Sequence, residues 1–217
     1  MRKKICKEDK LHIIENGIDI GSYKKEDRVN LPIPEDTFVI GMVGRICRQK
    51  APDVFVRMAG EVLKQLKNVQ FVIVGDVLEG KSDERREIEK MAESLGVNLY
   101  ITGWVPDPMA YMNRFDVGCL LSRWEGFGLA IPEYMLAGVP IVATKVDAIP
   151  SLIIDGETGV LVEKDDWQEA SRKIIELAND EAKRKKLVEN GKRTVQERFD
   201  ARRVSKECEE LYLQISC

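Results

Sequence analysis

Residues 117–144 read VGCLLSRWEGFGLAIPEYMLAGVPIVAT and contain the pattern of a strand, a helix and a second strand. The runs at 117–121 and 139–143 are apolar at successive positions, as expected for strands covered on both faces. Between them, Pro132 predicts the opening of a helix and Gly138 its end, because glycine adopts the left-handed cap conformation without steric cost. This order predicts two parallel strands with helices packed on them.

The same alternation continues on both sides of this stretch. Further strands are expected at residues 11–14, 38–43, 69–74, 98–101 and 159–162. Helices are expected from Pro52, over 88–95 up to Gly96, from Asp107-Pro108, and then at 167–178, 180–190 and 200–215. The predicted fold class is α/β, a Rossmann-like parallel sheet with helices on both faces and a C-terminal helical tail. No linker interrupts the chain, so residues 1–217 are expected to form one domain, with a core at 11–165 and the tail at 166–217.

The composition excludes several classes of protein. The chain has 217 residues, 44% hydrophobic and 33% charged, which is ordinary for a globular protein. Its 34 Lys and Arg against 37 Asp and Glu leave no excess of positive charge to bind nucleic acid or anionic lipid. The apolar runs are far shorter than the ~20 residues of a membrane span, so none is expected.

The five cysteines are odd in number, scattered and never spaced as CxxC: Cys6, Cys47, Cys119, Cys208 and Cys217. This spacing argues against a disulfide framework and a closed zinc site, and favours a reducing, cytoplasmic compartment. Residues 1–10 contain basic residues but no apolar segment after them, so no secretory signal is expected.

Polar residues in the loops after the strands are candidates for ligand binding, because open parallel sheets bind ligands beyond the carboxyl ends of their strands. After the strand at 38–43, Gly44 lets a ligand approach the backbone, and Arg45 and Lys50 can clamp phosphate oxygens. The alternative is that Arg45 and Lys50 are ordinary surface side chains that are solvated and bind no ligand. After the strand at 69–74 comes Gly75-Asp76, for which a plain turn is the alternative.

Two further loops carry candidates. The loop at 102–106 can offer backbone groups of Trp104 and Val105 to a base edge, although a packing role for the indole is the alternative. The loop at 122–129 places free amides at a helix start, where the positive end of the helix dipole attracts anions. Its candidate residues are Glu125, Gly126, Phe127, Gly128 and Leu129, followed by Glu133, whose carboxylate can accept bonds from a pair of ribose hydroxyls.

Taken together, these motifs resemble the C-terminal, donor-binding half of the group 1 (family 4) retaining glycosyltransferases, which have the two-domain GT-B architecture. The resemblance rests on Arg45 and Lys50, on FVIVGD at 71–76, and on EGFG at 125–128 with Glu133, an E-x7-E pattern. Asn16-Gly17-Ile18-Asp19, Asp155-Gly156 and residues 158–162 extend it, so that it runs from about residue 11 to residue 215.

The resemblance implies a nucleotide-linked sugar as substrate, with uridine, guanosine or adenosine as the nucleoside. Its diphosphate would be held by Arg45, Lys50 and the amides after Gly126, its ribose by Glu133, and its sugar hydroxyls by Glu125. Glu125, Arg45 and Lys50 are the expected catalytic residues. Gly44, Gly75, Asp76, Trp104, Val105, Gly126, Phe127, Gly128, Leu129 and Glu133 are the expected donor-binding residues. Transfer would retain the anomeric configuration without cofactor or metal, and the sequence contains no Asp-x-Asp.

The chain departs from the family pattern at several positions. Asp147-Ala148 and Ser151 stand where the family usually has two glycines and a carboxylate, and Ala51 replaces the usual glycine after Lys50. The donor sugar is therefore not predicted. The single histidine, His12, is expected as a packed core residue of the first strand.

An acceptor-binding N-terminal domain is expected to be missing, so the chain is interpreted as a fragment, inactive or weakly active alone. The final helix resembles the segment that crosses back to that domain. For the full-length enzyme, peripheral association with the inner face of a membrane stays open. A non-catalytic nucleotide-binding partner protein with the same fold is the alternative function. An oxidoreductase is disfavoured because GxGxxG is missing.

Overall fold

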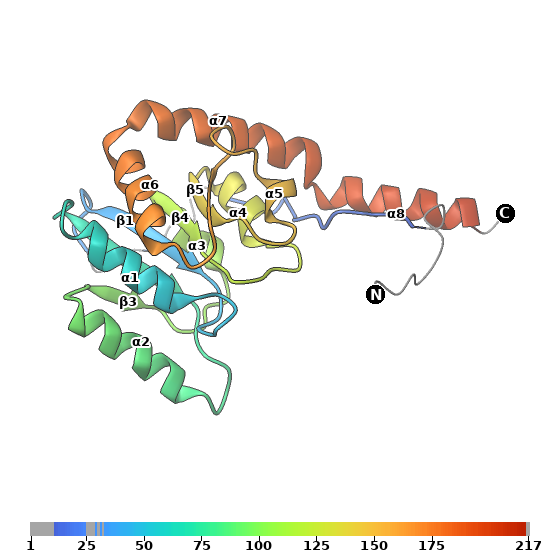
Figure 1. Ribbon diagram of the computed structural model, residues 1–217. Helices are drawn as coiled ribbons and strands as arrows, with labels where there is room; N and C mark the ends of the chain where they lie inside the picture. The colour runs from blue at the N-terminus through green and yellow to red at the C-terminus, as the bar shows by residue number, and fades with distance from the viewer. Residues whose placement is uncertain (1–10, 25–28, 30, 32, 216–217) are drawn as a thin grey trace.

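The protein forms one parallel sheet of six strands in the order β3-β2-β1-β4-β5-β6 (Figure 1). The computed structural model describes residues 11–24, 29, 31 and 33–215. The strands are β1 (Phe38–Val43), β2 (Val69–Val74), β3 (Leu99–Ile101), β4 (Val117–Leu120), β5 (Ile141–Thr144) and β6 (Val160–Val162). The predicted Rossmann-like α/β fold is confirmed.

Helices cover both faces of this sheet. The described helices are α1 (Pro52–Val62), α2 (Ser82–Ser94), α3 (Pro108–Met112), α4 (Ala130–Ala137), α5 (Ile149–Leu152), α6 (Trp167–Asn179), α7 (Glu181–Arg198) and α8 (Ala201–Ile215). Alternate side chains of each strand enter opposite cores. One core joins the sheet to α1, α2 and α6, and the other joins it to α3, α4 and α5, while α7 contributes Leu187 to the first and Val195 to the second.

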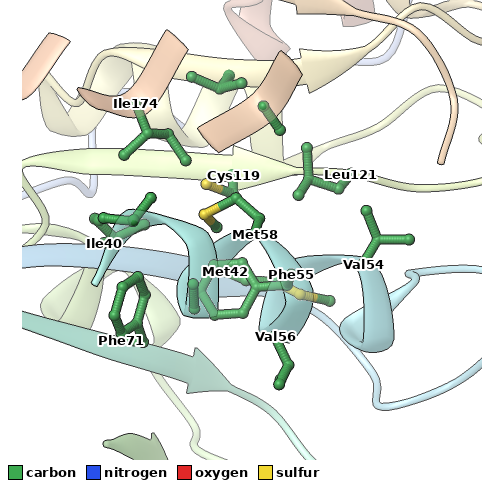
Figure 2. Close-up of a cluster of buried hydrophobic side chains, with 14 of the residues drawn as sticks. Ile40, Met42, Val54, Phe55, Val56, Met58, Phe71, Cys119, Leu121 and Ile174 are labelled. Carbon is green, nitrogen blue, oxygen red and sulfur yellow. The ribbon is translucent and has the colours of Figure 1, made fainter. Parts of the chain in front are cut away.

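The first core fixes the position of α1. Figure 2 shows Phe55 and Met58 of this helix among Met42 of β1 and Cys119 of β4, and Phe55 packs edge to face on Phe71 of β2. All five side chains are essentially buried. Burial also raises the pKa of the Cys119 thiol. Because these contacts hold the start of α1 at the carboxyl end of β1, they place the loop between the two elements.

Residues 11–14 do not form the predicted strand. Leu11 and Ile13 are 59% and 88% exposed, and the segment runs beside α8 (Figure 1). The prediction that His12 is a core residue is also wrong, because its side chain is exposed. A run of four residues, three of them apolar, does not show whether a neighbouring strand exists, and here the segment lies beside α8 instead.

Several helix boundaries differ from the predicted ones. Helix α2 begins at Ser82, six residues before the predicted start, because its first turns are charged and carry no apolar stripe. Helix α4 begins at Ala130, so Pro132 lies in its first turn, where the missing N–H would have had no partner within the helix. Helix α7 continues past residue 190 to Arg198. Gly191 therefore lies inside α7 and does not end it. Because this residue has no side chain, α7 can approach Met135 of α4 closely.

Within the described part of the chain, no helix is both long and apolar enough to cross a membrane. Cys47, Cys119 and Cys208 are free thiols. Cys6, Cys217 and the segment 1–10, on which the disulfide and signal predictions also rest, lie outside the described residues.

The close approach of Phe115 to β1 generates a prediction. A Cβ added at Gly41 would lie 2.0 Å from the Phe115 ring, so Gly41→Ala should destabilise the fold by about 1–3 kcal/mol. Removing the ring makes room for the new methyl group. The double variant Gly41→Ala/Phe115→Ala should therefore lose less than the two single variants together, as measured by urea unfolding. Strict additivity of the two losses would refute this contact.

Candidate functional site

The candidate site lies where the order of strands changes direction. From β1 the chain continues to β2 and β3 on one side, whereas from β4 it continues to β5 and β6 on the other. The loops after β1 and β4 therefore diverge from the same point of the sheet edge, and ligands of open α/β sheets bind at this switch point. The segments 44–51 and 121–129 occupy it.

A buried ion pair joins these two loops. The Lys50 ammonium lies 2.5 Å from Oε1 of Glu125, and the Ser122 hydroxyl donates to the same oxygen at 2.6 Å. The side chains of Lys50 and Glu125 are only 17% and 5% exposed. A carboxylate this far from water requires such partners, since an unpaired buried charge is strongly destabilising.

Backbone contacts hold the loops together beside this pair. The Arg123 amide donates to the Gln49 carbonyl at 2.8 Å, and the Gln49 side chain donates to the Trp124 carbonyl at 3.1 Å. Asp147 accepts a hydrogen bond from the Glu125 amide at 2.9 Å. These bonds fix the backbone on both sides of the ion pair.

The glycines after β1 and β2 allow a close approach of two loops. The Gly44 amide donates to the Val74 carbonyl, and a Cβ on Gly75 would lie 2.2 Å from the Gly44 oxygen. Gly75 also has a φ of 142°, which side chains disfavour. The adjacent Asp76 bonds Arg85 at 3.1 Å and the Val77 amide at 2.8 Å. Both of its oxygens are thus engaged within the protein.

The remaining predicted residues differ in how accessible they are. Arg45 is exposed, and no ion pair or side-chain hydrogen bond of it is found within the described residues. Trp104 and Leu129 are 79% and 46% exposed. Val105 packs on the hydrophobic core, and Phe127 packs edge to face on Phe199 with the ring centres 6.0 Å apart. The side chains of Val105 and Phe127 are therefore used for packing, and only their backbone groups are left for a ligand.

The two glycines around Phe127 have different surroundings. A Cβ on Gly126 would meet no atom within 4 Å, so its backbone borders open space. Gly128 is buried with a φ of 90°, and a Cβ there would lie 2.8 Å from Ile149. Gly126 leaves the approach to α4 open, whereas Gly128 makes the turn into the helix.

Glu133 lies in the first turn of α4 and lines a cavity of about 330 Å³. The cavity is also lined by Ile18, Asp19, Ser22, Tyr23, Lys24, Asp107, Met109, Ala110 and Leu136. Burial raises the pKa of Glu133 to about 7, and the Lys50 ammonium opposes part of the rise. The carboxyl group is therefore close to half-protonated at neutral pH, and it lies within electrostatic reach of the ion pair.

Arg123 was not among the predicted site residues. Its guanidinium binds both oxygens of Asp53, at 3.0 and 2.6 Å, and one oxygen of Asp165, at 2.7 Å. The hydrogen bond to Asp53 is the main reason why the pKa of Arg123 is raised. Asp147 was named only as a departure from the family pattern, and Ser122 only as part of the loop. The spacing of Ser122 three residues before Glu125 is a weak local signal, but the partners of Arg123 are remote in sequence.

Among the described residues, no three His, Cys, Asp or Glu side chains are grouped as metal ligands. The cations of the two loops are Lys50, which is paired with Glu125, and the exposed Arg45, and the start of α4 adds the positive end of a helix dipole.

Fold and site together define a Rossmann-like domain with a cluster of charged residues at its switch point. Residues 23–194 match the family described as glycosyl transferases group 1, and the chain belongs to this family. It corresponds to the C-terminal domain of the GT-B type.

The glycosyltransferase CapM of capsular polysaccharide biosynthesis in Staphylococcus aureus is 27% identical over 217 residues. These cover 96% of this chain and 56% of CapM. The D-inositol 3-phosphate glycosyltransferase of Segniliparus rotundus is 31% identical over 73% of this chain and 36% of its own length. The chain thus spans about half or less of these relatives.

Solved structures give the same result. The C-terminal domain of LpcC, a group 1 glycosyl transferase from Francisella tularensis, is 27% identical with a TM-score of 0.75. The match covers 85% of this chain and 99% of that domain. HepE from Anabaena, crystallised in complex with UDP-glucose, has a TM-score of 0.82 over 94% of this chain and 57% of its own. At 24% identity, HepE supports the fold.

The buried pair predicts a large effect of removing the cation. Lys50→Met leaves the Glu125 carboxylate without it, so a loss of about 3 kcal/mol or more is expected. The double variant Lys50→Met/Glu125→Gln should be more stable than Lys50→Met. Lys64→Met is the matched control, because Lys64 pairs with Glu61 at 2.6 Å but is 68% exposed; it should change stability by less than about 1 kcal/mol. Equal losses for Lys50→Met and Lys64→Met in urea unfolding would contradict the role of burial.

The raised pKa of Glu133 predicts a pH dependence. Between its ordinary pKa of 4.5 and about 7, the folded protein holds a proton that the unfolded chain has released. The free energy of unfolding is therefore highest with respect to this group below pH 4.5. It decreases by roughly 3 kcal/mol as the pH rises towards 7. Glu133→Gln cannot ionise, so the difference in unfolding free energy between variant and wild type should shift in favour of the variant as pH rises. A difference independent of pH in urea unfolding from pH 4.5 to 8 would exclude this titration.

Proposed function

We propose that this chain binds the nucleotide diphosphate sugar of a retaining glycosyltransferase, which transfers the sugar to an acceptor such as a growing polysaccharide or lipid-linked glycan. The observation that carries the proposal is the buried Lys50–Glu125 pair at the switch point, with Glu133 beside it. The name of CapM supports a polysaccharide as the type of acceptor.

Lys50 and Arg45 are proposed to bind the diphosphate and to neutralise it as it leaves. Lys50 is held in position by Glu125, whereas Arg45 is exposed and free to move onto a ligand. The backbone at Gly126 and the start of α4 add the positive end of a helix dipole. Fixed positive charge at the leaving group stabilises the transition state, so the proposed mechanism is independent of a metal ion.

Glu125 is proposed to accept a hydrogen bond from a sugar hydroxyl, in addition to holding Lys50. Glu133 is proposed to accept bonds from the ribose hydroxyls, and only its ionised form has both oxygens available as acceptors. Nucleotide binding should therefore lower the pKa of Glu133 from about 7. The remaining predicted contacts are backbone groups of Gly44, Gly75, Trp104, Val105 and Leu129, while the Asp76 side chain maintains the turn after β2.

The acceptor-binding domain is proposed to belong to the rest of a longer protein. The chain spans 56% of CapM, and α8 extends away from the sheet (Figure 1) with none of its side chains fully buried. Tyr212, Leu213 and Ile215 on this helix are 73%, 63% and 71% exposed. A second domain packed on α8 would cover them. We propose a cytoplasmic location for the complete enzyme, with acceptors held at the inner face of the membrane.

The experiment is nucleotide binding by this chain in the presence of EDTA. One of UDP, GDP and ADP should raise the melting temperature, and at a hundredfold excess over Kd the stabilisation should reach about 2.7 kcal/mol. Glu133→Ala and Arg45→Ala should remove most of the shift, whereas Lys64→Met should keep it. If none of the three nucleotides protects the wild type at millimolar concentration, the proposal fails for this chain.

A further inference from the structure

Strained backbone gathers around one part of the molecule. Within the described residues, the non-glycine positions with positive φ are Ala51 at 52°, Asp147 at 44° and Asp165 at 63°. Ala51 directly follows Lys50, Asp147 accepts the hydrogen bond of the Glu125 amide, and Asp165 accepts a hydrogen bond from Arg123. Strain of this kind persists only where surrounding contacts enforce it, and it often marks functional sites. All three positions adjoin the network around the Lys50–Glu125 pair.

Arg123 is the centre of this network. Its Nη1 and Nη2 atoms donate to the two oxygens of Asp53, and Nε donates to Asp165. Nη1 also donates to the Arg48 carbonyl at 3.0 Å. The side chain is 19% exposed. Every nitrogen of the guanidinium is thus bonded to the protein, so Arg123 itself has little capacity left for a ligand.

The partners of Arg123 lie close to both members of the ion pair. Asp53 is in the first turn of α1, three residues after Lys50, and the Arg48 carbonyl is two residues before it. Arg123 is itself two residues before Glu125. The guanidinium therefore ties the backbone that carries Lys50 to the backbone that carries Glu125, and Asp165 ties both to the loop between β6 and α6.

We propose that Arg123 is a positioning residue that holds Lys50 against Glu125 and thereby sets the affinity of the site for a diphosphate. This inference rests on the proposed function, since it assigns Arg123 an effect on the same ligand. Lysine cannot replace it fully, because a single ammonium group cannot bond both Asp53 oxygens, Asp165 and the carbonyl in the fixed fork of a guanidinium. Arg123→Lys should therefore be intermediate between wild type and Arg123→Ala.

Native-state hydrogen exchange tests the positioning directly, without a ligand. In Arg123→Ala, the amides of Lys50, Arg123 and Glu125 should exchange at least tenfold faster, while amides in the centres of β1 and β4 keep their wild-type rates. Arg184→Ala is the matched control. Arg184 also bonds backbone carbonyls, those of Leu177 and Ala178, and it lies over Phe38 at the opposite end of β1. This control should leave the three site amides unchanged.

The second readout is the affinity for whichever of UDP, GDP and ADP binds the wild type most tightly, measured by calorimetry in EDTA. Arg123→Ala should weaken binding at least tenfold, Arg123→Lys less, and Arg184→Ala not at all. Should Arg123→Ala fail to fold, Arg123→Lys carries both measurements, with smaller changes expected in the same direction.

The outcomes separate the two proposals. Faster exchange confined to the site amides together with weaker binding supports the inference. Unchanged exchange at the site, exchange accelerated throughout the sheet, or full affinity despite local opening overturns it. If the wild type binds none of the three nucleotides, the proposed function fails, and the exchange rates alone decide whether Arg123 positions the ion pair.

Discussion

The buried carboxylate of Glu125 is the constraint on which the site depends. At 5% exposure it cannot rely on water, so it must be held by Lys50 and Ser122 from two different segments. These segments leave the sheet at its switch point and run in different directions. The ion pair therefore holds the two loops together there. Other features keep the loops close to each other: the hydrogen bonds around the pair, the glycines after β1 and β2, and the strained residues near the pair.

The loops, and not the sheet, carry the charged residues of the candidate site. The apolar strands and the helices packed on them give a rigid frame, as in many α/β proteins with unrelated activities. What distinguishes this chain is the set of charges at one edge. The loops carry an ammonium held by Glu125, an exposed guanidinium and an open backbone before α4. Glu133, whose pKa is about 7, lies within electrostatic reach of the ammonium. In the proposed function, the positive groups bind the diphosphate and the carboxylates accept hydrogen bonds from the hydroxyl groups of the ribose and the sugar.

The sequence predicted the frame well because local patterns determine it. The strands β1 and β2 were predicted to the residue, since largely apolar runs end at Gly44 and Gly75. The strand at 11–14 was wrong because a short apolar run does not reveal its partner, and α7 was cut short because Gly191 serves packing and does not end the helix. In the site, the structure pairs Lys50 with Glu125 and buries Glu133, whereas the predicted roles of these three residues in binding stay predictions. The pairing of Arg123 with Asp53 spans 70 positions, so no local pattern could indicate it.

The most direct test of the central claim is to observe which amides respond to a nucleotide. In two-dimensional ¹H–¹⁵N NMR spectra of this chain with EDTA, titration with UDP, GDP or ADP should shift amides in three regions. We expect these at 44–51, at 75–76 and 103–105, and at 125–133, with the rest of the sheet unchanged. Shifts centred on another surface, or no response to any of the three nucleotides, would contradict a diphosphate site at the switch point.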